Sequence, residues 1–146
     1  MKNTNTLIKF FIALSVFFSS TLLFSCLSSS VEIPYESTDR EIIQLAQTEY
    51  DAGHTERALY CYNTLLKRYG NDTAIYVEGR YEIGHLYLKE KNYSMAEEIF
   101  EEIISIYDGS APGTLPGAFK KLTELDLEKI PESKRTTKVS TAEAIN

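Results

Sequence analysis

The chain has few of the residues on which metal centres and covalent catalysts depend. Among its 146 residues there are two cysteines, two histidines and no tryptophan. Seven glycines and four prolines are too few for a collagen-like or low-complexity chain. Basic residues are also scarce, because 15 Lys and Arg face 21 Asp and Glu, for a net charge of −6. A nucleic-acid-binding protein needs a basic face that neutralises phosphates, so nucleic acid is not expected as a partner.

Motifs that carry chemistry are equally sparse. The sequence contains no glycine-rich phosphate loop and no strand–turn–helix elbow around a serine. Glu82-Ile83-Gly84-His85 has a Glu-x-x-His spacing, with Glu78 one turn earlier. Di-iron helical bundles use this spacing twice and add further glutamates, so a single copy does not predict a metal site. We therefore expect no catalytic residue, no metal and no cofactor, and an enzyme is only a remote alternative.

The pattern of the amino-terminal residues predicts a targeting segment that is not part of the folded domain. After Lys2 and Lys9, the 15 residues Phe10 to Phe24 carry no charge. This stretch is shorter than the roughly 20 apolar residues that cross a bilayer. A basic start followed by an apolar stretch of this length is typical of a secretory signal.

The end of that segment, Leu23-Phe24-Ser25-Cys26, resembles the bacterial lipoprotein signal, although Phe24 stands where a small residue is usual. The resemblance implies a signal peptide over residues 1–25, cut before Cys26. Cys26 would then carry acyl chains, palmitate among them, and two or more chains give stable membrane anchoring. Residues 26–37 would be the lipidated cysteine and a flexible tether. The lack of Asp after Cys26 favours the outer membrane; an uncleaved anchor or an unlipidated secreted form are the alternatives.

A repeat occupies the middle of the chain. Residues 41–70 and 79–108 align without a gap at an offset of 38, so that small, large and aromatic positions agree. Apolar residues in each copy follow two helical stripes separated by a break, which predicts a pair of helices. Thr38 with Glu41, and Ser94 with Glu97, have the spacing of capping boxes. Gly84 costs about 1 kcal/mol in a helix interior, which favours a close helix–helix contact there.

These residues resemble the tetratricopeptide repeat (TPR). The second copy matches through Ile83-Gly84-x-x-Tyr87 and Tyr93-x-x-Ala96-x-x-x-Phe100, and the first copy is weaker. The resemblance implies an all-α fold, namely a short TPR-type α-solenoid of about two repeats plus a C-terminal capping helix, over residues 38–130. The loop between the two copies is longer than is usual in this family. In this respect the chain is similar to the TPR lipoproteins of outer-membrane-protein assembly and of the Tol–Pal system.

The last predicted helix begins near Pro116. Its apolar stripe is Ala118, Leu122, Leu125 and Ile130, with Phe119 beside them. Residues 131–146 are polar and are expected to form a disordered tail. Cys61 is expected to be a small apolar residue on a helix, and the acidic run Glu97, Glu98, Glu101 and Glu102 to be a solvated helix face.

In the TPR family the functional surface is the concave groove lined by the first helix of each repeat. Matching positions of this chain, as candidate protein-binding residues, are Ile43, Gln47, Tyr50, Asp51, Tyr81, His85, Leu88 and Lys89. The resemblance implies a lipid-anchored cell-envelope scaffold that binds another envelope protein, in outer-membrane assembly or envelope maintenance. The alternative is a TPR subunit that docks a periplasmic solute-binding protein for uptake of a small ligand. The oligomeric state is left open.

Overall fold

Each predicted repeat copy is a pair of consecutive helices in the computed structural model, which describes residues 31–136. Within that range the chain is all-α, as predicted, with no strand. The α-helices are α2 (Asp39–Asp51), α3 (Thr55–Tyr69), α4 (Thr73–Lys89), α5 (Tyr93–Gly109) and α6 (Gly117–Glu128), followed by the short 3-10 helix η1 (Glu132–Lys134). No helix in this part of the chain is long and apolar enough to cross a bilayer. The predicted signal peptide and Cys26 lie outside the described residues.

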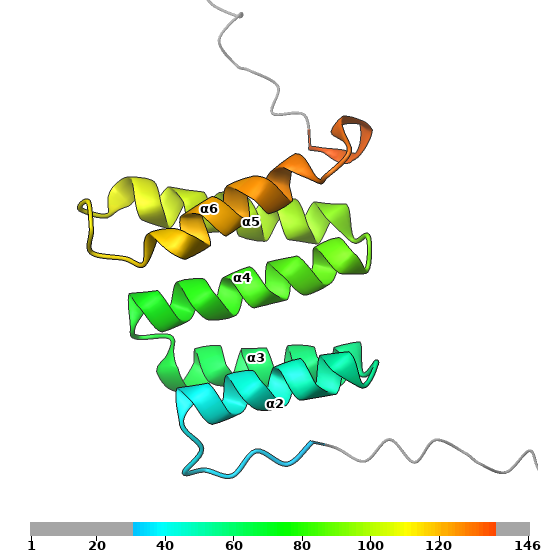
Figure 1. Cartoon of the computed structure of the whole chain (residues 1–146), viewed down its shortest axis with the longest axis vertical. Helices are drawn as coiled ribbons and strands as arrows, with labels where there is room; N and C mark the ends of the chain where they lie inside the picture. Colours follow the sequence, from blue (N-terminus) through cyan, green and yellow to red (C-terminus); the bar gives the residue numbers. More distant parts are fainter. Residues whose placement is uncertain (1–30, 137–146) are drawn as a thin grey trace, which may run out of the picture. The chain divides into compact units, whose positions relative to one another are not determined.

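The helices stack in chain order (Figure 1). α2 packs on α3, α3 on α4, α4 on α5 and α5 on α6, while α4 also contacts α6. Seen in Figure 1, α2 lies in front of α3 and α6 in front of α5. α2 and α6 therefore lie on one side of the stack, and α4 meets this side through its contacts with α6 and an ion pair with α2. This side, formed by the first helices α2 and α4 together with α6, is the one predicted to bind and is here named the first-helix side.

Local sequence explains where several of these helices begin. At α2 the predicted capping box is confirmed, because Thr38 N–H donates to Glu41 Oε2 at 2.8 Å and Glu41 N–H donates to Thr38 Oγ1 at 3.3 Å. α4 begins after Asp72, whose carboxylate accepts the N–H groups of Ala74 and Ile75. The second predicted box, Ser94 with Glu97, is wrong, since α5 begins after Asn92 without a side-chain cap and Glu97 bonds elsewhere.

Gly84 lies at a close contact between α4 and α5, as predicted. A Cβ at this position would lie 2.7 Å from Cε1 of Phe100 and 3.0 Å from Cγ2 of Ile99. Gly79 has the same role against α3, where a Cβ would lie 2.7 Å from Cδ2 of Leu66. The two glycines let α4 approach both neighbouring helices, because a side chain at either position would overlap the packed apolar groups.

The predicted stripe on α6 is wrong for most of its residues. Leu122 and Leu125 are each 40 % exposed, while Thr123 and Asp126 are buried, at 0 % and 2 % exposed. Ile130 is buried as expected. Helical periodicity selects the most apolar face, but α6 instead buries a face that carries Asp126, whose carboxylate is bonded by Tyr81 and His85 of α4. Thr123 is buried on the same face without a hydrogen-bond partner for its hydroxyl among residues 31–136. The leucines are left on the outer side of the stack.

Both ends of the described chain are held against the helices. Residues 31–37, expected as part of a flexible tether, lie against α3, where the Arg68 guanidinium donates to the carbonyls of Ile33 (3.0 Å) and Pro34 (2.6 Å). Residues 131–136, expected in the disordered tail, contain η1 and end where Thr136 donates its N–H and hydroxyl to Glu97 Oε2, at 2.6 and 2.8 Å. Residues 137–146 lie outside the described part.

Candidate protein-binding face

The first-helix side of the stack holds the predicted groove residues, but in three different environments. Ile43, Tyr81 and Leu88 are 4 %, 7 % and 8 % exposed and belong to the apolar core. Their assignment to a partner-binding surface is therefore wrong. Tyr81, for example, is covered by α6, because its ring packs against Phe119 and its hydroxyl donates to Asp126.

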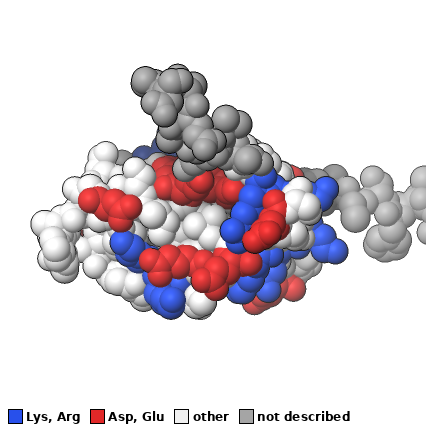
Figure 2. Space-filling view, turned by 90° about the horizontal axis from the view of Figure 1, so that it is seen from above, with Lys and Arg blue, Asp and Glu red and all other residues white. Residues whose placement is uncertain are grey.

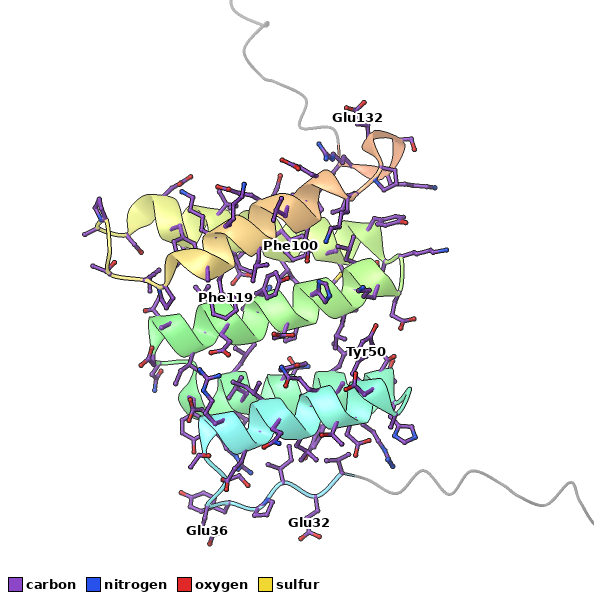
Figure 3. All side chains as sticks on the ribbon, viewed as in Figure 1. Glu32, Glu36, Tyr50, Phe100, Phe119 and Glu132 are labelled. Carbon is purple, nitrogen blue, oxygen red and sulfur yellow. The ribbon has the colours of Figure 1, made fainter. Side chains whose placement is uncertain are left out.

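The remaining five predicted residues reach the surface. Gln47, Asp51 and Lys89 are exposed, while Tyr50 and His85 are partly exposed. Figure 3 shows Tyr50 on α2 pointing toward α4, across the boundary between the two helix pairs. The face that a partner can reach is thus narrower and more polar than the sequence suggests, with the ring of Tyr50 near the C-terminal end of α2, where it also packs against the core.

An ion pair that the sequence analysis missed joins α2 to α4 on this side. Arg40 Nη1 lies 2.9 Å from Glu78 Oε1. The two residues are separated by 38 positions, which is the repeat offset, so they occupy equivalent places in the two copies. The sequence feature that could have predicted this ion pair is the presence of opposite charges at equivalent positions of the two copies. Because the Arg40 side chain is 70 % exposed, this pair contributes little stability, although it links the two first helices directly.

Asp126 on α6 forms the most connected polar cluster of the described chain. Its Oδ2 lies 2.6 Å from His85 Nδ1 and accepts the Tyr81 hydroxyl at 3.1 Å, and its Oδ1 lies 2.7 Å from Lys129 Nζ. Burial by itself would raise the pKa of this carboxyl, but the hydrogen bonds from Lys129, His85 and Tyr81 outweigh it and hold the pKa below its ordinary value.

This cluster joins α6 to α4 through the bonds of Asp126 with Tyr81 and His85. The same burial raises the pKa of Tyr81, with the Asp126 charge adding to the effect, so its hydroxyl stays protonated and donates. A catalytic His–Asp pair also needs a nucleophile within reach of the imidazole. Among the hydrogen bonds of residues 31–136, His85 has none to a serine, threonine or cysteine.

The Glu-x-x-His segment points its two side chains to different partners. Glu82 accepts from the Tyr62 hydroxyl at 3.4 Å, and burial raises the pKa of Glu82 above its ordinary value. His85 pairs with Asp126 instead. No group of three His, Cys, Asp or Glu side chains in residues 31–136 could hold a metal ion.

The acidic run on α5 is not simply a solvated face. Glu97 is only 5 % exposed and accepts from Thr136, and Glu102 pairs with Arg80 of α4 and accepts the Tyr76 hydroxyl at 2.5 Å. These glutamates join α5 to its neighbours, a role that depends on residues distant in sequence. At the α5–α6 end of the stack, Figure 2 shows acidic and basic groups interspersed with uncharged surface.

The described cysteine is a core residue. Cys61 on α3 is fully buried, and burial raises the pKa of its thiol to about 11, with the charge of Glu49 adding to the effect. A thiol that stays protonated and shielded is a poor nucleophile and a poor metal ligand. Cys61 therefore packs as a small apolar side chain, which agrees with its sequence interpretation.

Comparisons with known proteins identify a relative without a described activity. An uncharacterized protein of Treponema pallidum (strain Nichols) is 31% identical over 134 residues, which is 89% of this chain and 52% of that protein. The chain thus spans about half the length of this relative. No family model matches the chain, and no solved structure matches it.

Proposed function

We propose that the protein is a lipid-anchored scaffold of the bacterial cell envelope, which binds a partner protein through the first-helix side of a short TPR-like solenoid. The observation that carries the proposal is the arrangement of α2, α4 and α6 on one side, with accessible Gln47, Tyr50 and Lys89 between buried neighbours. An aromatic ring surrounded by polar groups is a common centre of a protein interface.

The TPR-like assignment is supported by the packing of small residues. Ala58 and Ala96, which are equivalent at the repeat offset, are both fully buried, and Gly84 contacts Phe100 as a helix-pairing glycine would. α6 stands where the first helix of a third repeat would follow, with contacts to both α4 and α5. The mechanism is recruitment, in which acyl chains on Cys26 hold the domain at a membrane, outer rather than inner, and the face selects the partner.

Photo-crosslinking in intact cells tests the binding face. A crosslinking amino acid at Gln47 and, separately, at Lys89 is expected to give an adduct with the same envelope protein, since both positions are exposed and belong to the proposed face. The matched control is Ser105, an exposed position on the second-helix side of the stack. An adduct from Ser105, with none from Gln47 and Lys89, would place the interface on the other side and refute the proposed face.

A truncation at Tyr50 measures the strength of the interface. Tyr50→Ala is expected to weaken capture of that partner by about thirtyfold, the equivalent of 2 kcal/mol for a central aromatic anchor. Tyr81→Ala is unsuitable for this purpose, because Tyr81 is buried and its loss would disturb the fold. If instead a small molecule stabilises the domain and Tyr50→Ala leaves protein capture unchanged, docking of a solute-binding protein becomes the better explanation.

Anchoring is tested separately. Cys26→Ala is expected to abolish incorporation of a fatty-acid probe and to move the protein out of the detergent phase, because the acyl chains are attached through this thiol. Probe incorporation that persists in Cys26→Ala would refute the anchor without bearing on the binding face.

A further inference from the structure

The two most exposed large apolar side chains of the described residues lie together at the α2–α3 end of the stack. Tyr35 is 88 % exposed and Tyr60 is 55 % exposed. They line one open depression, here named the Tyr35–Tyr60 patch. Its other lining residues are Asn63, Thr64, Lys67 and Arg68.

The exposure of Tyr35 is enforced by the fold. The turn that carries it is closed by a hydrogen bond from Ser37 N–H to the Pro34 carbonyl, at 3.2 Å. Arg68 donates to that same carbonyl, and the Tyr69 hydroxyl donates to the Ser37 carbonyl at 2.6 Å. The backbone on both sides of Tyr35 is therefore held to α3, so the ring is presented outward on a rigid support. Such a ring loses little conformational entropy when it is covered.

The charge of the patch differs from that of the whole chain. No carboxylate lines it, and it contains Lys67 and Arg68, whereas the chain has a net charge of −6. The Arg68 guanidinium bonds backbone carbonyls rather than a carboxylate. Glu32 and Glu36 lie at the same end of the stack, outside the lining of the patch (Figure 3). Tyrosine rings favour the boundary between lipid headgroups and acyl chains, and a nearby cation favours lipid phosphates.

The position of the patch in the chain identifies what covers it. Five peptide units separate Cys26 from Val31, where the docked segment begins. Fully extended, they span at most about 18 Å. We propose that the Tyr35–Tyr60 patch rests in the headgroup layer of the membrane that holds the Cys26 acyl chains, an inference that depends on the proposed lipid anchor.

This contact would orient the molecule on the membrane. The α2–α3 end faces the bilayer, and the α5–α6 end points away from it, since the two ends are opposite in the stack (Figure 1). The bilayer then does not cover the first-helix side, which stays open to a partner. The anchor by itself would leave the domain free to rotate, whereas two aromatic contacts and Lys67 restrict it to one orientation.

The absence of tryptophan from the chain allows a direct test. Tyr35→Trp and Tyr60→Trp each introduce a single indole into the full lipidated protein, and Leu125→Trp on α6 is the matched control at the other end. The proteins are reconstituted into phosphatidylcholine vesicles whose lipids are brominated near the top of the acyl chains. Bromine quenches indole fluorescence on contact, so at least twofold quenching is expected at positions 35 and 60 and none at 125. Flotation of the vesicles reports anchoring independently.

Each outcome has one meaning. A protein that floats with the vesicles but is not quenched at positions 35 and 60 overturns the patch and leaves the anchor standing. Equal quenching at all three positions indicates unoriented adsorption and also overturns it. A protein that does not float overturns the anchor and, with it, this inference. Lys67→Glu in the Tyr60→Trp protein is expected to reduce the quenching, because a carboxylate would face the lipid phosphates.

Discussion

The contact at Gly84 allows the packing of the α4–α5 pair to be tested by a graded substitution. In Gly84→Ala, the new Cβ would lie 2.7 Å from Cε1 of Phe100 and 3.0 Å from Cγ2 of Ile99, both well inside ordinary contact distance. Neither Phe100 nor Ile99 has free space nearby, since their exposed fractions are 0 % and 2 %. The helices must therefore move apart, or the ring must leave its preferred rotamer.

The magnitude follows from two opposed effects. Overpacking a core costs about 1–3 kcal/mol, while replacing glycine by alanine inside a helix stabilises by up to about 1 kcal/mol. Gly84→Ala should then destabilise the domain by about 0–2 kcal/mol. Gly84→Leu adds three more carbons to the same gap, and its loss should approach about 3 kcal/mol. For a domain of about 100 residues, 1 kcal/mol corresponds to a change of about 4–5 °C in the melting temperature.

The assay is thermal unfolding of the full chain, followed by circular dichroism at 222 nm. Gly84→Leu is expected to lower the melting temperature by about 13 °C, with Gly84→Ala between it and the unaltered protein. Gly109→Ala is the matched control, because a Cβ at Gly109 in α5 meets nothing within 4 Å. A melting temperature of Gly84→Leu within 2 °C of the unaltered protein, at about the precision of the assay, would refute the close contact and the helix pairing built on it.

Three further predictions concern other parts of the structure. The pKa of Asp126 is lowered in the folded state. The stabilising effect of this carboxylate is therefore present above about pH 4 and is lost as the pH falls through the lowered pKa. In acid, the melting temperature should fall less steeply for Asp126→Asn than for the unaltered protein. Arg68→Ala removes the donors that hold residues 31–37, and amide hydrogen exchange in that segment should accelerate at least tenfold while α5 is unaffected. Cys61, with a thiol pKa of about 11 and no exposure, should react with a thiol reagent only after denaturation. A total of one reactive thiol per denatured chain is expected if Cys26 is acylated, and two would contradict acylation.

Residues close together in sequence determined the helix pairs. The capping box of Thr38 and Glu41 depends on a spacing of three residues, which is a local property of the chain. The agreement of small and large residues at an offset of 38 placed Ala58, Ala96 and Gly84 at contacts, because a repeat must bury the same positions in each copy. The all-α class and the α4–α5 contact followed from these local and periodic signals.

Tertiary structure decided which face of α6 is buried and which groove residues are accessible. Asp126 is buried because Tyr81 and His85, about 40 positions earlier, donate to it, and this compensates the cost of removing its charge from water. Hydrophobic periodicity has no access to such partners and so favoured Leu122 and Leu125. Tyr81 was expected at the surface, but a later helix, α6, covers it. The repeat pattern gave no information on that contact. The partners of Asp126 lie on another helix, so only the assembled stack reveals them.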